Sequence, residues 1–144
     1  MKPSQTLKTL LWVNELRESL AKEDFQRGQR ALKELEEMLQ EITRRPEKLY
    51  QRLEGRVLSG QELHLFAQQI SSTLQEKEKV EQILQTKRQE LEKLRQKAVK
   101  AYQQRRMAEI LHERAQEAYQ KELEENERKE LDDMVLLRRG KDGL

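Results

Sequence analysis

The sequence has no cysteine, only two prolines and five glycines, and few aromatic residues. Without thiols, disulfide bonds and cysteine-based catalysis or metal ligation are excluded. No apolar run approaches the ~18 residues of a membrane span, and residues 1–9 lack the apolar core of a signal peptide. Opposite charges nearly cancel, at a formal +2, so overall charge favours neither nucleic acid nor membrane as a partner. We therefore expect a cytoplasmic protein.

The composition favours long helices over a compact globule. Charged residues make up 39% of the chain and hydrophobic residues 35%, a balance typical of long helices or of disorder. Residues 61–139 contain neither glycine nor proline and are rich in helix-forming residues. Ser59 and Glu62 have the spacing of a capping box, with Leu58 and Leu63 at the hydrophobic-staple positions. The sequence predicts a helix over 60–137 and a flexible tail over 138–144.

The apolar residues of this helix form one narrow seam. They follow alternating steps of three and four residues, the a/d pattern of a coiled coil, interrupted at Thr73, Lys77 and Lys87. The seam comprises Leu63, Phe66, Ile70, Val80, Leu84, Leu91, Leu94, Ala98, Ala101, Ala108 and Ala115. A stripe of this width covers one or two partner helices and not a globular core.

A second helix is predicted over 5–53, with residues 54–60 as the turn between the two. Its start carries a drifting apolar stripe of Leu7, Leu10, Leu11, Val13, Leu16 and Leu20, and a regular seam follows from Phe25 to Leu53. Gly28 lies on that seam, where a bulky neighbour can pack close to the backbone. Proline removes a backbone donor and crowds the preceding turn, so we expect near Thr43–Pro46 either a kink or the end of the straight coil, with one or two more turns beyond it.

The fold class that follows is all-α, a long antiparallel two-helix coiled coil in which the second helix overhangs. If Leu53 lies beside Leu63, antiparallel pairing brings Leu7 near Ala108. The first helix then extends no further along the second, which projects alone from about Ile110. A trimeric or tetrameric bundle of several copies is an open alternative, because seam composition fixes oligomeric state poorly.

No pattern in the sequence predicts catalysis, a cofactor or a metal site. His112 and Glu113 begin like a zinc-protease motif, but Gln116 stands where the second histidine is needed. The glycines are scattered singly and cannot form a phosphate-binding loop. A basic stretch over 87–106 could meet phosphates, but Tyr102 is its one aromatic residue and no nucleic-acid-binding module is recognised. We expect neither an enzyme nor a nucleic-acid-binding protein.

The run Glu127-Arg128-Lys129-Glu130-Leu131-Asp132-Asp133-Met134 resembles the closing signature of a known family. It is similar to the Glu-Gln-Lys-x-Leu-Asp-Glu run of the flagellar export protein FliJ family, a coiled-coil component of bacterial type III export. Glu127, Lys129, Leu131 and Asp132 match this run, while Arg128 and Asp133 depart from it. The starts of both predicted helices, at 7–15 and at 59–70, are also similar to the family.

The resemblance implies a cytoplasmic stalk similar to the central stalk of rotary ATPases. Such a stalk sits in the pore of the hexameric export ATPase, promotes ring assembly and links the ring to the membrane export-gate protein. Family members also bind export chaperones. The resemblance thus implies a protein at the cytoplasmic face of the inner membrane, associated with the membrane only through its partners. A coiled-coil tether or cargo chaperone that binds partner helices is the alternative function.

Two partner-binding surfaces are predicted. The first lies near the hairpin tip and comprises Phe66, Ile70 and Leu74, although ordinary coil packing would use the same spacing. The second is the C-terminal run and comprises Glu127, Lys129, Leu131, Asp132 and Met134. We expect the end that carries both termini to enter the ATPase ring, because its overhang lacks a partner helix. A frayed, solvated end is the alternative.

Overall fold

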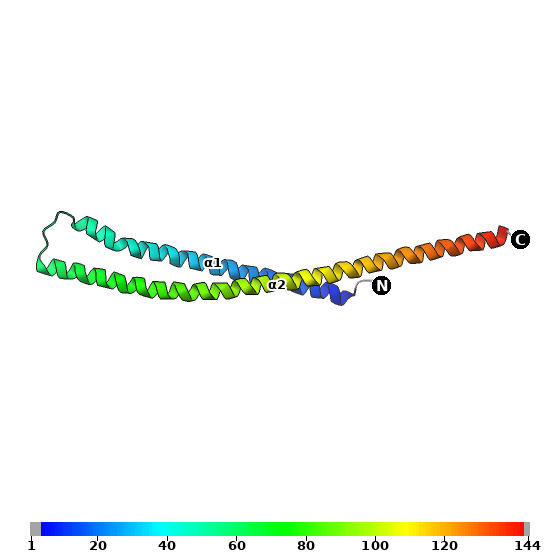
Figure 1. Cartoon of the computed structure of the whole chain (residues 1–144), viewed down its shortest axis with the longest axis horizontal. Coiled ribbons are helices and arrows are strands. Elements are labelled where there is room, and N and C mark those ends of the chain that lie inside the picture. The colour runs from blue at the N-terminus through cyan, green and yellow to red at the C-terminus, as the bar shows by residue number, and fades with distance from the viewer. Residues whose placement is uncertain (1–3, 143–144) are drawn as a thin grey trace. The chain divides into compact units, whose positions relative to one another are not determined.

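Two long helices make up the described part of the chain. The computed structural model describes residues 4–142, in which α1 spans Gln5–Leu53 and α2 spans Gly60–Asp142, with no strand (Figure 1). This confirms the all-α helical hairpin that the sequence predicts. The helix over 60–137 continues to Asp142, so the predicted tail begins as helix. Residues 143–144 of that tail lie outside the described part.

The helix ends follow the local capping signals. The Ser59 hydroxyl accepts a hydrogen bond from the Glu62 N–H at 3.2 Å, which satisfies one of the free donors at the start of α2. The Ser4 hydroxyl likewise caps α1 and accepts a hydrogen bond from the Leu7 N–H at 3.3 Å. Gly55 follows the end of α1 with a φ of 77°, the left-handed conformation in which glycine ends a helix without steric cost. The loop between the two helices thus lies between Leu53 and Gly60.

Pro46 does not end α1. The helix continues through it for seven further residues, to Leu53. The Thr43 hydroxyl, one turn earlier, donates to the Leu39 carbonyl at 2.8 Å. Pro46 is half-buried on the seam at the a/d spacing that Leu39 and Leu53 also follow. The proline therefore packs as a seam residue within a continuous helix.

The chain divides into two compact units. The hairpin unit covers residues 21–98, and the terminal unit combines residues 1–20 with 99–144. In the hairpin unit α1 and α2 run antiparallel on either side of the loop (Figure 1). Its apolar core is the seam, where Ile42 is fully buried and Val80 and Leu84 are 8% and 3% exposed. Ion pairs join the two helices outside the core, between Arg45 and Glu76 at 2.9 Å and between Glu36 and Arg88 at 3.6 Å.

Gly28 allows close contact between the helices of the hairpin unit. A Cβ at this position would lie 2.9 Å from Leu91 Cδ1 and 3.2 Å from Leu94 Cδ1. The role predicted for this glycine is therefore confirmed. The partners Leu91 and Leu94 lie further along α2 than the register predicted from Leu53 and Leu63.

The terminal unit pairs the start of α1 with the second half of α2. Glu18 meets Arg105 across this pair, whereas the predicted register placed Leu11 there. The predicted contact of Leu7 with Ala108 is therefore wrong. The observed pairing is shifted along the helices by roughly one to two helical turns from the predicted one. Next to the loop, Tyr50 still meets Phe66, as the predicted register requires, so the shift does not arise at the loop.

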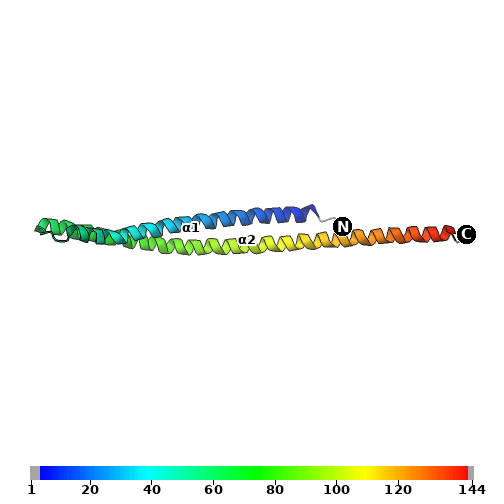
Figure 2. The same ribbon diagram turned by 90° about the horizontal axis from the view of Figure 1, so that it is seen from above.

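The later register moves the start of the overhang. Gln5 lines a groove together with Tyr119 and Gln120, so α1 extends beside α2 well past Ile110. From Gln120 to Gly140 every side chain of α2 is exposed. In this unit α2 runs on beyond the start of α1 (Figure 2). The overhang is therefore confirmed, but it begins about three turns later than predicted.

Candidate partner-binding surfaces

The predicted tip surface consists of Phe66, Ile70 and Leu74 on α2. Phe66 and Ile70 are half-buried in the seam, and the Phe66 ring meets the edge of Tyr50 from α1, with centroids 5.4 Å apart and planes at 75°. Such edge-to-face geometry stabilises an aromatic pair. Leu74 lies one position beyond the seam residue Thr73 and is 54% exposed. Two of the three side chains thus serve the coil, and Leu74 is open to a partner.

Further exposed apolar side chains lie near this surface, and the sequence prediction did not include them. Val57 in the loop is fully exposed, and Leu63 and Leu65 at the start of α2 are 57% and 59% exposed. Leu63 was expected in the seam. It is exposed because α1 ends at Leu53 and leaves this seam position without a partner helix. Leu63 and Leu74 are eleven residues apart, close to three helical turns, so they lie on the same side of α2.

The groove at the tip is basic on its α1 wall. Arg45, Lys48 and Arg52 line it from α1, and Leu65, Ser72 and Glu76 line it from α2. The Arg45 guanidinium is held across the groove by Glu76. A partner that docks beside Leu65 therefore meets both apolar and cationic side chains.

The predicted C-terminal surface lies on the overhang. Glu127, Lys129 and Asp132 are exposed, as are Leu131 at 61% and Met134 at 56%. The neighbouring apolar residues Val135, Leu136 and Leu137 are exposed by 47%, 64% and 69%. The structure brings the residues of the run together on one helix and places no α1 side chain against them. The overhang thus combines an acidic stretch with apolar side chains.

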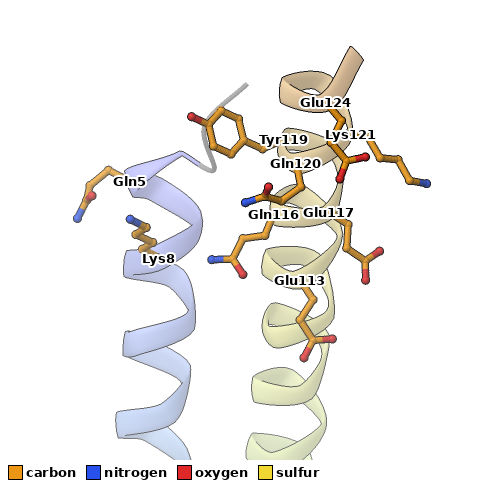
Figure 3. A pocket seen from close by; sticks show the side chains of 9 residues that line it. All are labelled: Gln5, Lys8, Glu113, Gln116, Glu117, Tyr119, Gln120, Lys121 and Glu124. Carbon is orange, nitrogen blue, oxygen red and sulfur yellow. The ribbon is translucent and has the colours of Figure 1, made fainter. Parts of the chain in front are cut away.

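A polar groove lies where α1 begins beside α2. Gln5 and Lys8 line it from α1, and the α2 wall includes Gln116, Tyr119 and Gln120 (Figure 3). Gln116 and Tyr119 point toward the first turns of α1, whereas Glu113 and Glu117 point away from it. The predicted register placed the start of α1 near Ala108, so this groove was not predicted.

A cluster of charges is enclosed between the helices of the terminal unit. The Arg105 Nε donates to Glu18 Oε2 at 2.5 Å, and its Nη1 donates to Glu109, one turn along α2. The Glu18 side chain is only 8% exposed and that of Arg105 21%. The hydrogen bond from Arg105 to Glu18 raises the pKa of the guanidinium above its ordinary value, against the opposing effect of burial. Arg105 thus joins the two helices of the terminal unit, because it pairs with Glu18 of α1 and with Glu109 of α2.

Residues 4–142 contain neither a cluster suited to a metal ion nor a helix suited to span a membrane. No group of three or more histidine, aspartate or glutamate side chains in 4–142 is arranged to hold a metal ion. None of the helices in the same part of the chain has the length and apolar content needed to cross a membrane.

Comparison with known proteins gives one family. No curated protein and no solved structure matches the chain. The family model of the flagellar FliJ protein matches residues 3–142 of the 144-residue chain, which is nearly all of it. The match includes both helices, the tip surface and the C-terminal run. The chain therefore belongs to the FliJ family, whose members are non-catalytic components of flagellar protein export.

Proposed function

We propose that the chain is a stalk of the flagellar export apparatus. Its terminal end enters the ring of the hexameric export ATPase, and its tip contacts the membrane export-gate protein and export chaperones. The protein works in the cytoplasm and reaches the inner membrane only through these partners. Family membership supports a role in export, and the two surfaces on α2 support the assignment of partners to ends.

The observation that carries the proposal is the overhang of α2. The helix remains regular to Asp142, while every side chain from Gln120 to Gly140 is exposed. Apolar side chains such as Leu131 and Met134 lie among carboxylates there, and they need an external surface to be buried. A single helix is narrow enough for the central hole of a ring, and a basic or polar pore lining would complement its acidic stretch.

The mechanism that follows is mechanical and allosteric. A helix that lies off-centre or presents different side chains around its circumference contacts the subunits of a ring unequally. Such contacts change the populations of subunit states only through their differential affinity for those states. The stalk would then promote ring assembly and turnover without contributing any reacting group.

The tip is assigned to the export gate because apolar side chains beside the loop of the hairpin unit are open to a partner. Leu63, Leu65 and Leu74 are each more than half exposed. Exposed apolar patches of this kind mark sites of protein interaction. The basic wall at Arg45 and Lys48 adds a preference for an acidic partner surface.

Truncation after Tyr119 tests the assignment. The truncated chain keeps every residue of α2 that the structure shows as buried or half-buried, so its thermal midpoint should change little. We expect stimulation of the purified export ATPase to be lost and binding of the export-gate protein to be retained. The reverse pattern would overturn the assignment of the ends.

A matched full-length variant distinguishes the loss of helix length from the loss of apolar surface on the overhang. Leu131→Ala with Met134→Ala keeps the helix and its charges but removes apolar area from the overhang. Reduced ATPase stimulation by this variant would support a direct contact. If the intact chain itself leaves the ATPase rate unchanged, the alternative of a tether or cargo chaperone is favoured.

A further inference from the structure

The seam of the terminal unit differs in chemistry from that of the hairpin unit. Between residues 21 and 98 the buried core positions are apolar, as at Ile42, Val80 and Leu84. In the terminal unit α1 instead contributes Asn14 and Glu18, each 6% exposed. The facing section of α2 contributes Ala101, Arg105, Ala108, His112 and Ala115, of which Ala108 is buried and the others half-buried. Polar or small side chains thus replace large apolar ones.

The large apolar side chains at the start of α1 mostly face away from α2. Leu10, Leu16 and Leu20 are 42%, 47% and 51% exposed, whereas Leu7 and Leu11 are half-buried in the seam. Apolar burial is the main stabilising contribution to helix pairing. The first four turns of α1 therefore contact α2 through the half-buried Leu7, Leu11 and Val13 and contain no fully buried apolar side chain, unlike the hairpin unit.

Separation breaks the ion pair between Glu18 and Arg105, but Asn14 and Arg105 each keep a partner on their own helix. The Asn14 Nδ2 donates to the Leu10 carbonyl of its own helix at 2.8 Å. Arg105 keeps Glu109, on its own helix, as a partner. Removing one member of a buried ion pair usually leaves the other charge unpaired, and this second carboxylate prevents that outcome. Glu18 becomes hydrated when the helices part.

His112 adds an unfavourable contribution to the paired state. Its Nε2 atom is buried and has no hydrogen-bond partner in the described part of the chain. A buried polar atom without a partner carries a desolvation cost that contact with water removes. Separation of α1 from α2 would hydrate this nitrogen.

We propose that residues 5–20 of α1 form a strap that detaches reversibly from residues 99–119 of α2 while the hairpin unit stays paired. Detached, the strap is a short helical segment anchored at one end, and such segments are marginally stable in water. It then presents the side chains of Leu7 and Leu11 as well as the apolar residues that already face solvent. The single-helix section of α2 is lengthened from its start near Gln120 back toward Val99. This inference rests on the seam alone and does not depend on the proposed function.

Double electron–electron resonance tests the strap directly. The chain has no cysteine, so two introduced cysteines are the only labelling sites. Thr9→Cys with Arg114→Cys places labels on exposed positions of the strap and of α2, and Gln29→Cys with Lys93→Cys does so in the hairpin unit. We expect a short and a long distance population for the strap pair and one population for the control pair. One narrow population for both pairs would overturn the proposal.

Two substitutions on the strap give a matched comparison. Leu11→Ala removes apolar contact from the seam, whereas Leu10→Ala removes a leucine that faces solvent. Loss of about half of a buried leucine's transfer free energy should raise the ratio of open to closed strap roughly tenfold for Leu11→Ala. Leu10→Ala should leave that ratio unchanged. Equal effects of the two substitutions would contradict the strap.

Hydrogen exchange on the unlabelled wild-type chain gives a second readout. Backbone amides of residues 9–20 should exchange at least tenfold faster than those of residues 25–50, because they open locally without separation of the hairpin unit. Replacement of the polar seam by Asn14→Leu, Glu18→Leu and Arg105→Leu should slow that exchange. Uniform protection along α1 in the wild type would overturn the proposal.

Discussion

Glu18 of α1 and Arg105 of α2 form an ion pair across the terminal unit, with Oε2 and Nε 2.5 Å apart. The raised pKa of Arg105 keeps the guanidinium charged at every pH below its ordinary value, and its contribution is lost only as the pH rises through the raised value. The basic member of the pair therefore does not titrate under physiological conditions. The pair places opposite charges next to each other at one position of the seam, and so favours the register in which α1 and α2 bring them together.

Arg105→Met should lower the thermal midpoint by several degrees, because it removes the ion pair that joins the nearly buried Glu18 of α1 to α2. The neighbouring Arg106 provides the control. Its side chain is 46% exposed and pairs with Glu109 on the same helix, so Arg106→Met should change the midpoint by much less. Circular dichroism melts give both values. Equal midpoints for the two variants would show that the pair across the helices contributes nothing.

A comparison of two isoleucines tests the core of the hairpin unit. Ile42 is 0% exposed, whereas Ile83, next to the seam residue Leu84, is 48% exposed. Ile42→Ala should reduce the free energy of unfolding by about 2–5 kcal/mol through lost burial and a residual cavity. Ile83→Ala should reduce it by less than about 1 kcal/mol. Urea unfolding followed by circular dichroism measures both, and a similar loss at the two positions would contradict the described seam.

The helices, the caps and the loop could be predicted because their signals are local. A long run without glycine or proline, a serine three residues before a glutamate and a glycine after the last seam residue each act within a few residues. Ser59 therefore has the capping role expected of it, and Gly55 lies in the predicted turn. The family was recognised for a related reason, since its C-terminal run is a contiguous stretch of sequence.

The seam at the start of α1 was predicted wrongly. Hydrophobicity favoured Leu10, Leu16 and Leu20, but these side chains are exposed, and Asn14 and Glu18 occupy the seam. Continuing the strict steps of three and four backward from Phe25 would have given the observed positions. A continuous helix keeps one face toward its partner, so the register of the longer apolar section determines which residues face α2 here.

The starting point of the overhang and the exposure of the tip could not be obtained from periodicity. Both depend on which residues of α1 and α2 lie opposite each other, and heptads repeat identically after a shift of seven residues. The same ambiguity hid the groove at Gln5 and Tyr119. Long-range pairs such as Arg105 with Glu18 decide the register, and no local pattern identifies them.

Gly28 and Gly140 test the packing of helical glycines. Both lie inside helices, where alanine is favoured over glycine by about 0.5–1 kcal/mol. At Gly140 a Cβ meets no atom within 4 Å, so Gly140→Ala should strengthen the end of α2 by roughly that amount. At Gly28 the Cβ meets the tip of Leu91 at 2.9 Å, so Gly28→Ala should gain less or lower the thermal midpoint. A clear gain in stability from Gly28→Ala would show that the leucines yield without cost.

Leu74 and Ile70 separate partner binding from coil packing at the tip. Leu74 is 54% exposed, so Leu74→Ala should leave the thermal midpoint nearly unchanged. Ile70 is half-buried in the seam, so Ile70→Ala should lower the midpoint. If the tip contacts the export gate, Leu74→Ala should also weaken binding of the purified export-gate protein about tenfold, as for an apolar interface residue worth more than 1 kcal/mol. Isothermal titration calorimetry measures that affinity. Unchanged binding by Leu74→Ala would exclude this leucine from the interface, and a large loss of stability on the same substitution would assign it to the core.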